Sequence, residues 1–157
     1  MNFYSFVVAM CLIIAAPVVE ASEYHQYRNQ RYGFRMNYPS DFTVDAPAFN
    51  GDGQIFRKNQ RCMIWSSGIN NLSEFKLHSL EVELKKEFDQ MTSLSRGRRW
   101  VELAGYKGDD FLVIKSYVGK GAINELRIRQ PRSGIPCEVA TAPIIRSFKP
   151  GRLDEIR

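Results

Sequence analysis

One stretch of this chain repeats apolar residues at helical spacing, and its contrast with the surrounding segments sets the fold class. The residues that share one helical face, three or four positions apart, are Leu77, Leu80, Leu84, Phe88 and Met91. Ser73 is a suitable N-cap, and Glu74 would lie in the first turn, where negative charge is favourable. Glu81 and Lys85 would form an i, i+4 pair on the solvent side. The pattern predicts a long helix over about residues 74–91.

Short segments with two-residue alternation, or with β-branched and aromatic residues, fill most of the remaining chain. Turn residues separate them, and the strongest turn signal is Asn-Gly-Asp-Gly at 50–53. Pro143 suits the first position of a short helix over about 143–149. The order predicts an α+β fold, in which a mostly antiparallel sheet of about six to eight strands is flanked by the two helices. The predicted strands are 34–38, 42–44, 54–57, 62–67, 100–104, 111–118, 123–129 and 137–141.

The N-terminal segment has the character of a targeting signal. Residues 6–19 are almost wholly apolar, which is too short for a typical membrane span of about 20 residues. Val19 and Ala21 fit positions −3 and −1 of a cleavage site, so residues 1–21 are predicted to be a cleaved signal peptide. An uncleaved membrane anchor is the alternative. Cleavage would leave a single domain over 22–150 and a frayed tail over 151–157, without a membrane span, in the periplasm or secreted.

Two cysteines remain after the predicted cleavage, Cys62 and Cys137. An even number of cysteines in an exported chain favours a disulfide. A bridge closing a loop of about 75 residues would contribute about 4 kcal/mol, before any strain in the native state is subtracted. The alternative is a pair of buried free thiols.

Basic residues outnumber acidic ones, and the net charge is +5. Loss of Glu20 with the signal would raise the positive charge by one further unit. Because export makes nucleic acid an unsuitable partner, an envelope protein or an anionic surface is the better candidate. The alternative is an ordinary solvated surface with salt bridges to Glu102 or Glu125. The residues singled out for partner contact are Asp52, Arg96, Arg98, Arg99, Arg127 and Arg129.

No set of residues in the sequence indicates catalysis. His25 and His78 have no second ligand at metal-binding spacing, and no histidine is placed for a hydrolytic triad. Asp109 and Asp110 follow a glycine and are better explained as turn residues than as paired catalytic carboxylates. The sequence therefore predicts no cofactor, no metal and no catalytic residue, with an envelope hydrolase using Asp109 or Asp110 as a remaining hypothesis.

Several short motifs follow one another in a distinctive order. They are Tyr32-Gly33-Phe34, Tyr38-Pro39-Ser40-Asp41-Phe42, Asn50-Gly51-Asp52-Gly53-Gln54, the central helix, Gly108-Asp109-Asp110-Phe111-Leu112-Val113 and Ile145-Arg146-Ser147-Phe148-Lys149-Pro150. In order and spacing, the chain resembles small exported bacterial relatives of the PsbP/Mog superfamily. It departs from them at Lys115-Ser116-Tyr117, where members often have Trp or Phe before Ser-Gly. It departs again at Ile135-Pro136-Cys137, where an aromatic-Pro pair is usual.

The resemblance implies a seven-stranded or similar antiparallel sheet flanked by helices, and a non-enzymatic binding or accessory role. Three functional hypotheses follow. The first is an exported binding protein with a protein partner in the cell envelope. The second is an immunity or inhibitor protein that neutralises an envelope-acting toxin or wall hydrolase, and the positive charge favours an acidic or neutral toxin. The third is the envelope hydrolase.

Overall fold

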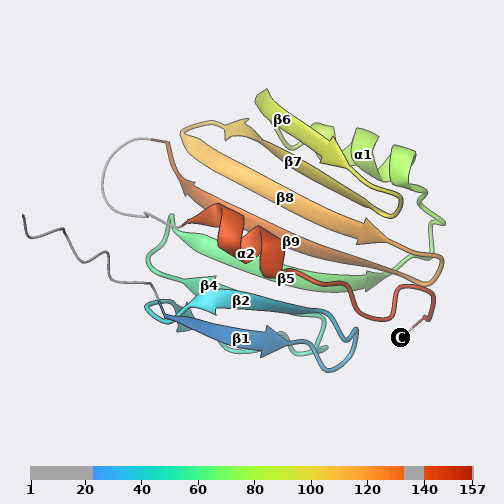
Figure 1. Cartoon of the computed structure of the whole chain (residues 1–157), viewed down its shortest axis with the longest axis horizontal. Helices are drawn as coiled ribbons and strands as arrows, with labels where there is room; N and C mark the ends of the chain where they lie inside the picture. Colours follow the sequence, from blue (N-terminus) through green and yellow to red (C-terminus); the bar gives the residue numbers. More distant parts are fainter. Residues whose placement is uncertain (1–22, 133–139, 157) are drawn as a thin grey trace, which may run out of the picture.

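Nine strands and two helices make up the described part of the computed structural model, residues 23–132 and 140–156 (Figure 1). Seven strands form one antiparallel sheet in the order β3-β4-β5-β9-β8-β7-β6. The predicted α+β fold with a mostly antiparallel sheet is confirmed. The bounds of these strands are Thr43–Val44 (β3), Gly53–Arg57 (β4), Met63–Asn70 (β5), Gln90–Arg96 (β6), Trp100–Lys107 (β7), Asp110–Val118 (β8) and Ala122–Pro131 (β9).

Some predicted features lie outside the described residues. These are the signal peptide at 1–21, Cys137 and most of the strand predicted at 137–141. Thr141, the last residue of that predicted strand, already belongs to a helix, α2 (Thr141–Ser147). The short C-terminal helix is therefore present, but it begins about two residues earlier than predicted.

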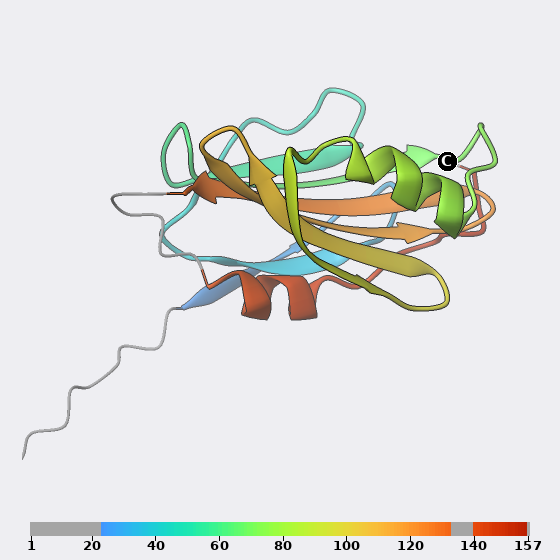
Figure 2. The same ribbon diagram turned by 90° about the horizontal axis from the view of Figure 1, so that it is seen from above.

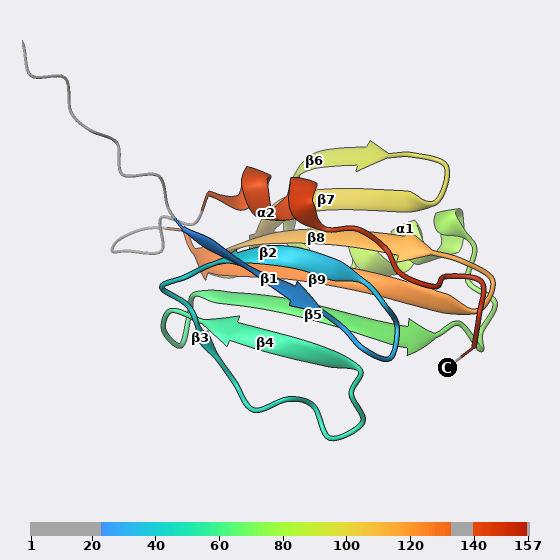
Figure 3. The ribbon, with the colours of Figure 1, turned by 60° about the horizontal axis from the view of Figure 1, so that its bottom comes forward.

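A second, two-stranded sheet lies across one face of the large sheet together with α2 (Figures 2 and 3). It consists of β1 (Tyr24–Arg28) and β2 (Arg35–Pro39). β1 was not among the predicted strands, because only Tyr24 and Tyr27 interrupt its polar sequence. Both tyrosines pack against the core, which explains why this polar segment forms a strand.

The face of the large sheet under β1, β2 and α2, here called the covered face, carries an aromatic core. Phe34, Phe56 and Phe148 are fully buried there. The Phe148 ring makes edge contacts with Phe34, at 5.9 Å between centroids, and with Tyr117, at 5.7 Å. Burial of each such ring contributes about 2–3 kcal/mol, so this layer supplies much of the stability of the fold.

The opposite face carries α1 (Leu77–Lys85), which packs against β7 and β8 (Figure 2). Leu80 and Leu84 of the helix are buried on a second apolar cluster that includes Leu103 and Ile114. Glu81 was predicted on the solvent side, but its side chain is only 4% exposed. It accepts a hydrogen bond from Lys85 at 2.7 Å and lies 3.3 Å from Arg96 of β6, so two cations accompany the buried carboxylate.

The helix predicted over 74–91 is wrong in length, since α1 has nine residues. Glu74 has a φ of 53°, which is incompatible with a right-handed helix, so α1 begins after it. At the other end, the N–H of Asp89 donates to the carbonyl of Tyr106 and joins the sheet instead. Phe88 and Met91 still pack on the α1 cluster, but from the turn and from β6.

β6 occupies a segment whose second half was predicted to be a loop. Six of its seven residues are exposed, and only Met91, which is half-buried, packs on the core. As an edge strand it pairs with β7 alone, with an irregular register between Met91 and Ser93. An edge strand with few buried residues gives no alternation for a sequence to reveal.

The C-terminal segment, for which a frayed tail was expected, is hydrogen-bonded from Gly151 to Leu153. The N–H of Gly151 donates to Oδ1 of buried Asn124 at 2.8 Å, and that of Arg152 donates to the carbonyl of Tyr32 at 2.9 Å. The carbonyl of Leu153 accepts from the N–H groups of Gly121 and Ala122. These bonds hold the tail against β9, the β1–β2 connection and the turn between β8 and β9.

Candidate functional site

Three neighbouring strands, β4, β5 and β9, present a surface that α1 leaves exposed. Trp65 of β5 is paired in register with Arg127 of β9, which is paired with Ile114 in the cluster under α1. Trp65 therefore faces the α1 side of the sheet, yet it is 44% exposed, and Ile69 is 52% exposed. We call this surface the open face. Its residues are Ile55, Arg57, Met63, Trp65, Ser67, Ile69, Glu125, Arg127 and Arg129.

Trp65 and Arg127 form the centre of the open face. The guanidinium of Arg127 lies 5.4 Å from the Trp65 ring, within the range of a cation–π interaction. The same guanidinium pairs with Glu125 and lies 3.5 Å from Glu87. A hydrogen bond from Lys107, together with the charge of Arg127, holds the pKa of Glu87 below its ordinary value. The tryptophan is thus held by a charged network while much of its ring stays accessible.

Each arginine of the open face has a carboxylate partner. Besides the Arg127–Glu125 pair, Arg57 binds Asp45 at 2.6 Å and Arg129 lies 3.6 Å from Asp110. The pair with Glu125 agrees with the alternative expectation of salt bridges on this surface. Positive and negative side chains are therefore interspersed on the open face. A mosaic of this kind suits a protein partner better than a polyanion.

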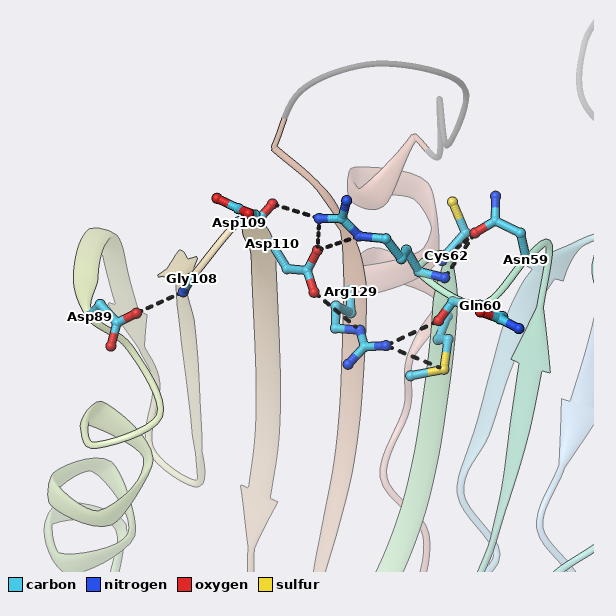
Figure 4. Close-up of polar contacts among 10 residues, drawn as sticks. Asn59, Gln60, Cys62, Asp89, Gly108, Asp109, Asp110 and Arg129 are labelled. Carbon is cyan, nitrogen blue, oxygen red and sulfur yellow. Dashed lines mark hydrogen bonds and ion pairs between the residues drawn. The ribbon is translucent and has the colours of Figure 1, made fainter.

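Asp109 and Asp110 are the carboxylates of the hydrolase hypothesis. Asp109 lies in the turn between β7 and β8, and Asp110 is the first residue of β8 (Figure 4). Arg61 donates to Oδ1 of Asp110 at 2.7 and 3.2 Å and to the backbone carbonyl of Asp109 at 3.1 Å. Arg129 approaches the other oxygen of Asp110 and donates to the carbonyl of Gln60 at 3.1 Å. Asp110 therefore anchors two arginines, an arrangement that favours a structural role.

The structure separates the three arginines of the 96–99 segment. Arg96 reaches back to Glu81 on α1. Arg98 and Arg99 instead line a pocket of about 840 Å³ at the end of the sheet where β5 and β8 terminate. Arg127 and Arg129 lie on the open face, on the outward side of β9 as their alternation with Leu126 and Ile128 indicates.

Asp52 lies in the turn before β4 and is engaged locally. It accepts from Arg31 at 2.6 Å and from the side chain of Asn50. The side chain of Asn29 donates to the carbonyl of Gly51 at 2.9 Å, which ties the same turn to the β1–β2 connection. Asp52 therefore braces a turn, and it is remote in register from Arg129 on β9.

Cys62 is fully buried just before β5. Its predicted partner, Cys137, lies outside the described residues, so the pairing stays a prediction. Trp65 and Ile69 were not singled out from the sequence. The alternation of Ile64, Trp65 and Ser66 does place Trp65 on the opposite face from Ile64, but it does not reveal that α1 stops short of β5.

Within residues 23–132 and 140–156, no three His, Cys, Asp or Glu side chains gather closely enough to hold a metal ion. None of the helices in these ranges is long and apolar enough to cross a bilayer.

Comparisons with known proteins identify the fold. No protein-family model matches the chain, and no curated protein does. The solution structure of cyanobacterial PsbP (CyanoP) from Synechocystis sp. PCC 6803 is similar, with a TM-score of 0.58 at 10% identity, over 88% of this chain and 98% of that one. A crystal structure from Bacteroides thetaiotaomicron VPI-5482 has a TM-score of 0.45 at 21% identity, over 74% of this chain and 44% of that one. The likeness to CyanoP shows that this chain has a PsbP-like fold.

Proposed function

Starting from a PsbP-like fold, we propose that this chain is a non-enzymatic binding or accessory protein whose open face contacts a partner protein. The fold alone does not name a function, since one fold serves many. The observation that carries the proposal is Trp65, a large aromatic ring that is 44% exposed at the centre of an uncovered sheet face.

The composition of the open face is that of a protein interface. Tryptophan and arginine are enriched among residues that dominate binding energy, and Met63, Trp65 and Arg127 are adjacent here. Ile69 extends the apolar surface along β5. Arg57 and Arg129 with their carboxylate partners frame it, as the polar rim of an interface does.

The location that we propose is the periplasm or the exterior of the cell. It is supported by the predicted signal peptide at residues 1–21 and by the two cysteines that remain after its removal. Mass spectrometry of the protein purified from its host tests this: export with cleavage predicts an N-terminus at Ser22, and a retained Met1 would contradict it.

Quantitative affinity purification from the host envelope, with mass spectrometry, tests the contact. The wild type is compared with Trp65→Ala and with Val82→Ala, a substitution of a similarly exposed apolar residue (42%) on α1. We expect one stoichiometric protein with the wild type and Val82→Ala. With Trp65→Ala its recovery should fall about tenfold or more, as for an interface hot spot.

Two outcomes contradict the proposal: no partner at any salt concentration, or a partner that Trp65→Ala retains fully. The identity of the partner decides the form of the function. A toxin or wall hydrolase would make this chain an inhibitor, whereas a non-enzymatic assembly would make it an accessory subunit.

A further inference from the structure

The pocket of about 840 Å³ shares no residue with the open face and lies at the end of the sheet where β5 and β8 terminate. Four segments form it: the connection from β5 into α1, the β6–β7 turn, the β8–β9 turn and the C-terminal tail. Its volume is within the range of about 300–1,000 Å³ that is typical of small-molecule sites.

Asn71, which is buried, fixes one wall of the pocket. Its side-chain amide donates to the carbonyls of Phe75 at 2.9 Å and Gly119 at 2.8 Å, and its Oδ1 accepts from the N–H of Phe75 at 2.8 Å. These bonds hold the connection into α1 on the β8–β9 turn. Glu74, with its left-handed φ of 53°, completes the turn between them.

Arg99 fixes a second wall of the pocket. Its guanidinium donates to both oxygens of Asp154, at 3.1 and 2.7 Å, and its Nε donates to the carbonyl of Val118 at 3.3 Å. The hydrogen bonds from Arg99 hold the pKa of the Asp154 carboxyl below its ordinary value. A side chain at Gly119 would collide with Arg99 and with the carbonyl of Leu153, so the walls meet closely at this glycine. The pocket is therefore built by specific contacts and does not result from loose loops.

Positive charge is in excess around the pocket. Lys76, Arg98, Arg99 and Lys120 line it, against two carboxylates, Glu74 and Asp154. Arg99 is bound to Asp154, whereas Lys76, Arg98 and Lys120 form no ion pair with any residue that the structure describes. A concave surface with an excess of one sign of charge attracts ligands of the opposite sign.

Apolar side chains share the lining with these cations. Phe75 and Leu77 at the start of α1, with Val118 at the end of β8, contribute this surface. We propose that the pocket binds a small amphiphilic anion. Its phosphate or carboxylate would be held by Lys76, Arg98 and Lys120, and its apolar stem would lie against Phe75, Leu77 and Val118. This site is independent of the open face, so either can fail without the other.

The test is an NMR titration of the isotope-labelled protein, purified as its host processes it, with phenyl phosphate and with neutral benzyl alcohol. We expect phenyl phosphate to shift the amide signals of residues 71–77, 97–99 and 118–121. Benzyl alcohol should bind at least about tenfold more weakly than phenyl phosphate, because the cations contribute charge-assisted hydrogen bonds only to the phosphate.

Two double variants distinguish the effect of the pocket cations on binding from the effect of the protein's net charge. Arg98→Gln with Lys120→Gln should weaken phenyl phosphate binding about tenfold, since both lost cations line the pocket. Lys58→Gln with Lys86→Gln removes the same charge from residues outside it and should change the affinity less than about twofold. Equal weakening by both pairs, equal binding of benzyl alcohol, shifts confined to other surfaces or no binding would each overturn the proposal.

Vesicle sedimentation distinguishes the source of the anion once phenyl phosphate binds in the pocket. Co-sedimentation with phosphatidylglycerol vesicles, but not with phosphatidylcholine vesicles, and its loss in the Arg98→Gln, Lys120→Gln variant identify a lipid headgroup. Pocket binding of phenyl phosphate without co-sedimentation identifies a soluble anion.

Discussion

The covered and open faces share the strands β4, β5 and β9, and the two faces differ in the burial and the charge of their side chains. Along β5, Ile64 faces the covered side and is fully buried, while its neighbour Trp65 faces the open side and is 44% exposed. Along β9, Leu126 is 1% exposed, whereas Arg127 next to it joins a charged network. The alternation of the strands thus divides their side chains between a buried face that stabilises the fold and a face that α1 leaves exposed.

The covering elements create this difference. β1, β2 and α2 span the covered face, while α1 lies over β7 and β8 (Figures 1 and 2). Substitutions on the covered face should therefore reduce stability, and substitutions on the open face should reduce binding with little effect on stability.

The largest effect is expected from Phe148→Ala. The ring is fully buried and contacts Phe34 and Tyr117, so its loss should lower the free energy of unfolding by about 3–5 kcal/mol. Trp65→Ala is the matched open-face control and should cost about 1 kcal/mol or less, because much of that ring is in water. Urea denaturation measures both. Equal losses would show that Trp65 belongs to the core, contrary to the comparison.

The predicted Cys62–Cys137 disulfide would stabilise the protein at β5 and β9, two of the strands that form the open face. It would tie the start of β5 to the chain beyond β9, and its reduction should lower the free energy of unfolding by about 2–4 kcal/mol. Alkylation of the unfolded, non-reduced protein followed by mass spectrometry counts the free thiols. One bridge predicts no modification at these two cysteines, and modification of both would establish free thiols instead.

A smaller effect is expected from Glu81→Gln on α1, about 1–2 kcal/mol near pH 7. The hydrogen bond from Lys85, with the nearby charge of Arg96, lowers the pKa of Glu81 against the opposing effect of burial. Because its pKa is lower in the folded state, the Glu81 carboxylate stabilises the protein at pH values above its unfolded-state pKa of about 4.3. This stabilisation is lost as the pH falls through the folded-state pKa. The difference between wild type and variant should therefore shrink below about pH 4.

Glu83→Gln is the control for this prediction, since Glu83 is half exposed on the same helix and pairs with Lys86. It should change the free energy of unfolding by less than about 0.5 kcal/mol. A loss for Glu81→Gln that stays constant from pH 7 to pH 3 would contradict an ionic role for Glu81.

The strands of the large sheet were predictable where one face is buried. β9 shows its alternation in the sequence, and the outward direction of Arg127 follows from it, whereas β8 was predicted from its run of β-branched and aromatic residues. β6 was not predictable, because an exposed edge strand shows no alternation of apolar and polar residues. The helical spacing of Leu80 through Met91 correctly identified core contacts. It could not show that Phe88 and Met91 make them from outside the helix, because that depends on Asp89 pairing with β7.

The candidate site was only partly predictable. Arg127 and Arg129 were singled out for partner contact, and so were Arg96, Arg98 and Arg99, which the sequence grouped together. Trp65 became a candidate only when the position of α1 was known, because Trp65 is exposed where α1 packs on β7 and β8 and does not cover β5. The separation of Arg96 from Arg98 likewise depends on the buried Glu81, which the helical pattern placed in solvent.

The central claim is that the open face contacts a protein, and a photo-crosslinking amino acid at position 65 tests it most directly. The same amino acid at position 82 is the control, because Val82 is 42% exposed on α1 and lies outside the open face. In irradiated host cells, we predict one discrete crosslinked species from position 65 and none from position 82. No crosslink at position 65, or the same species from both positions, would contradict the claim.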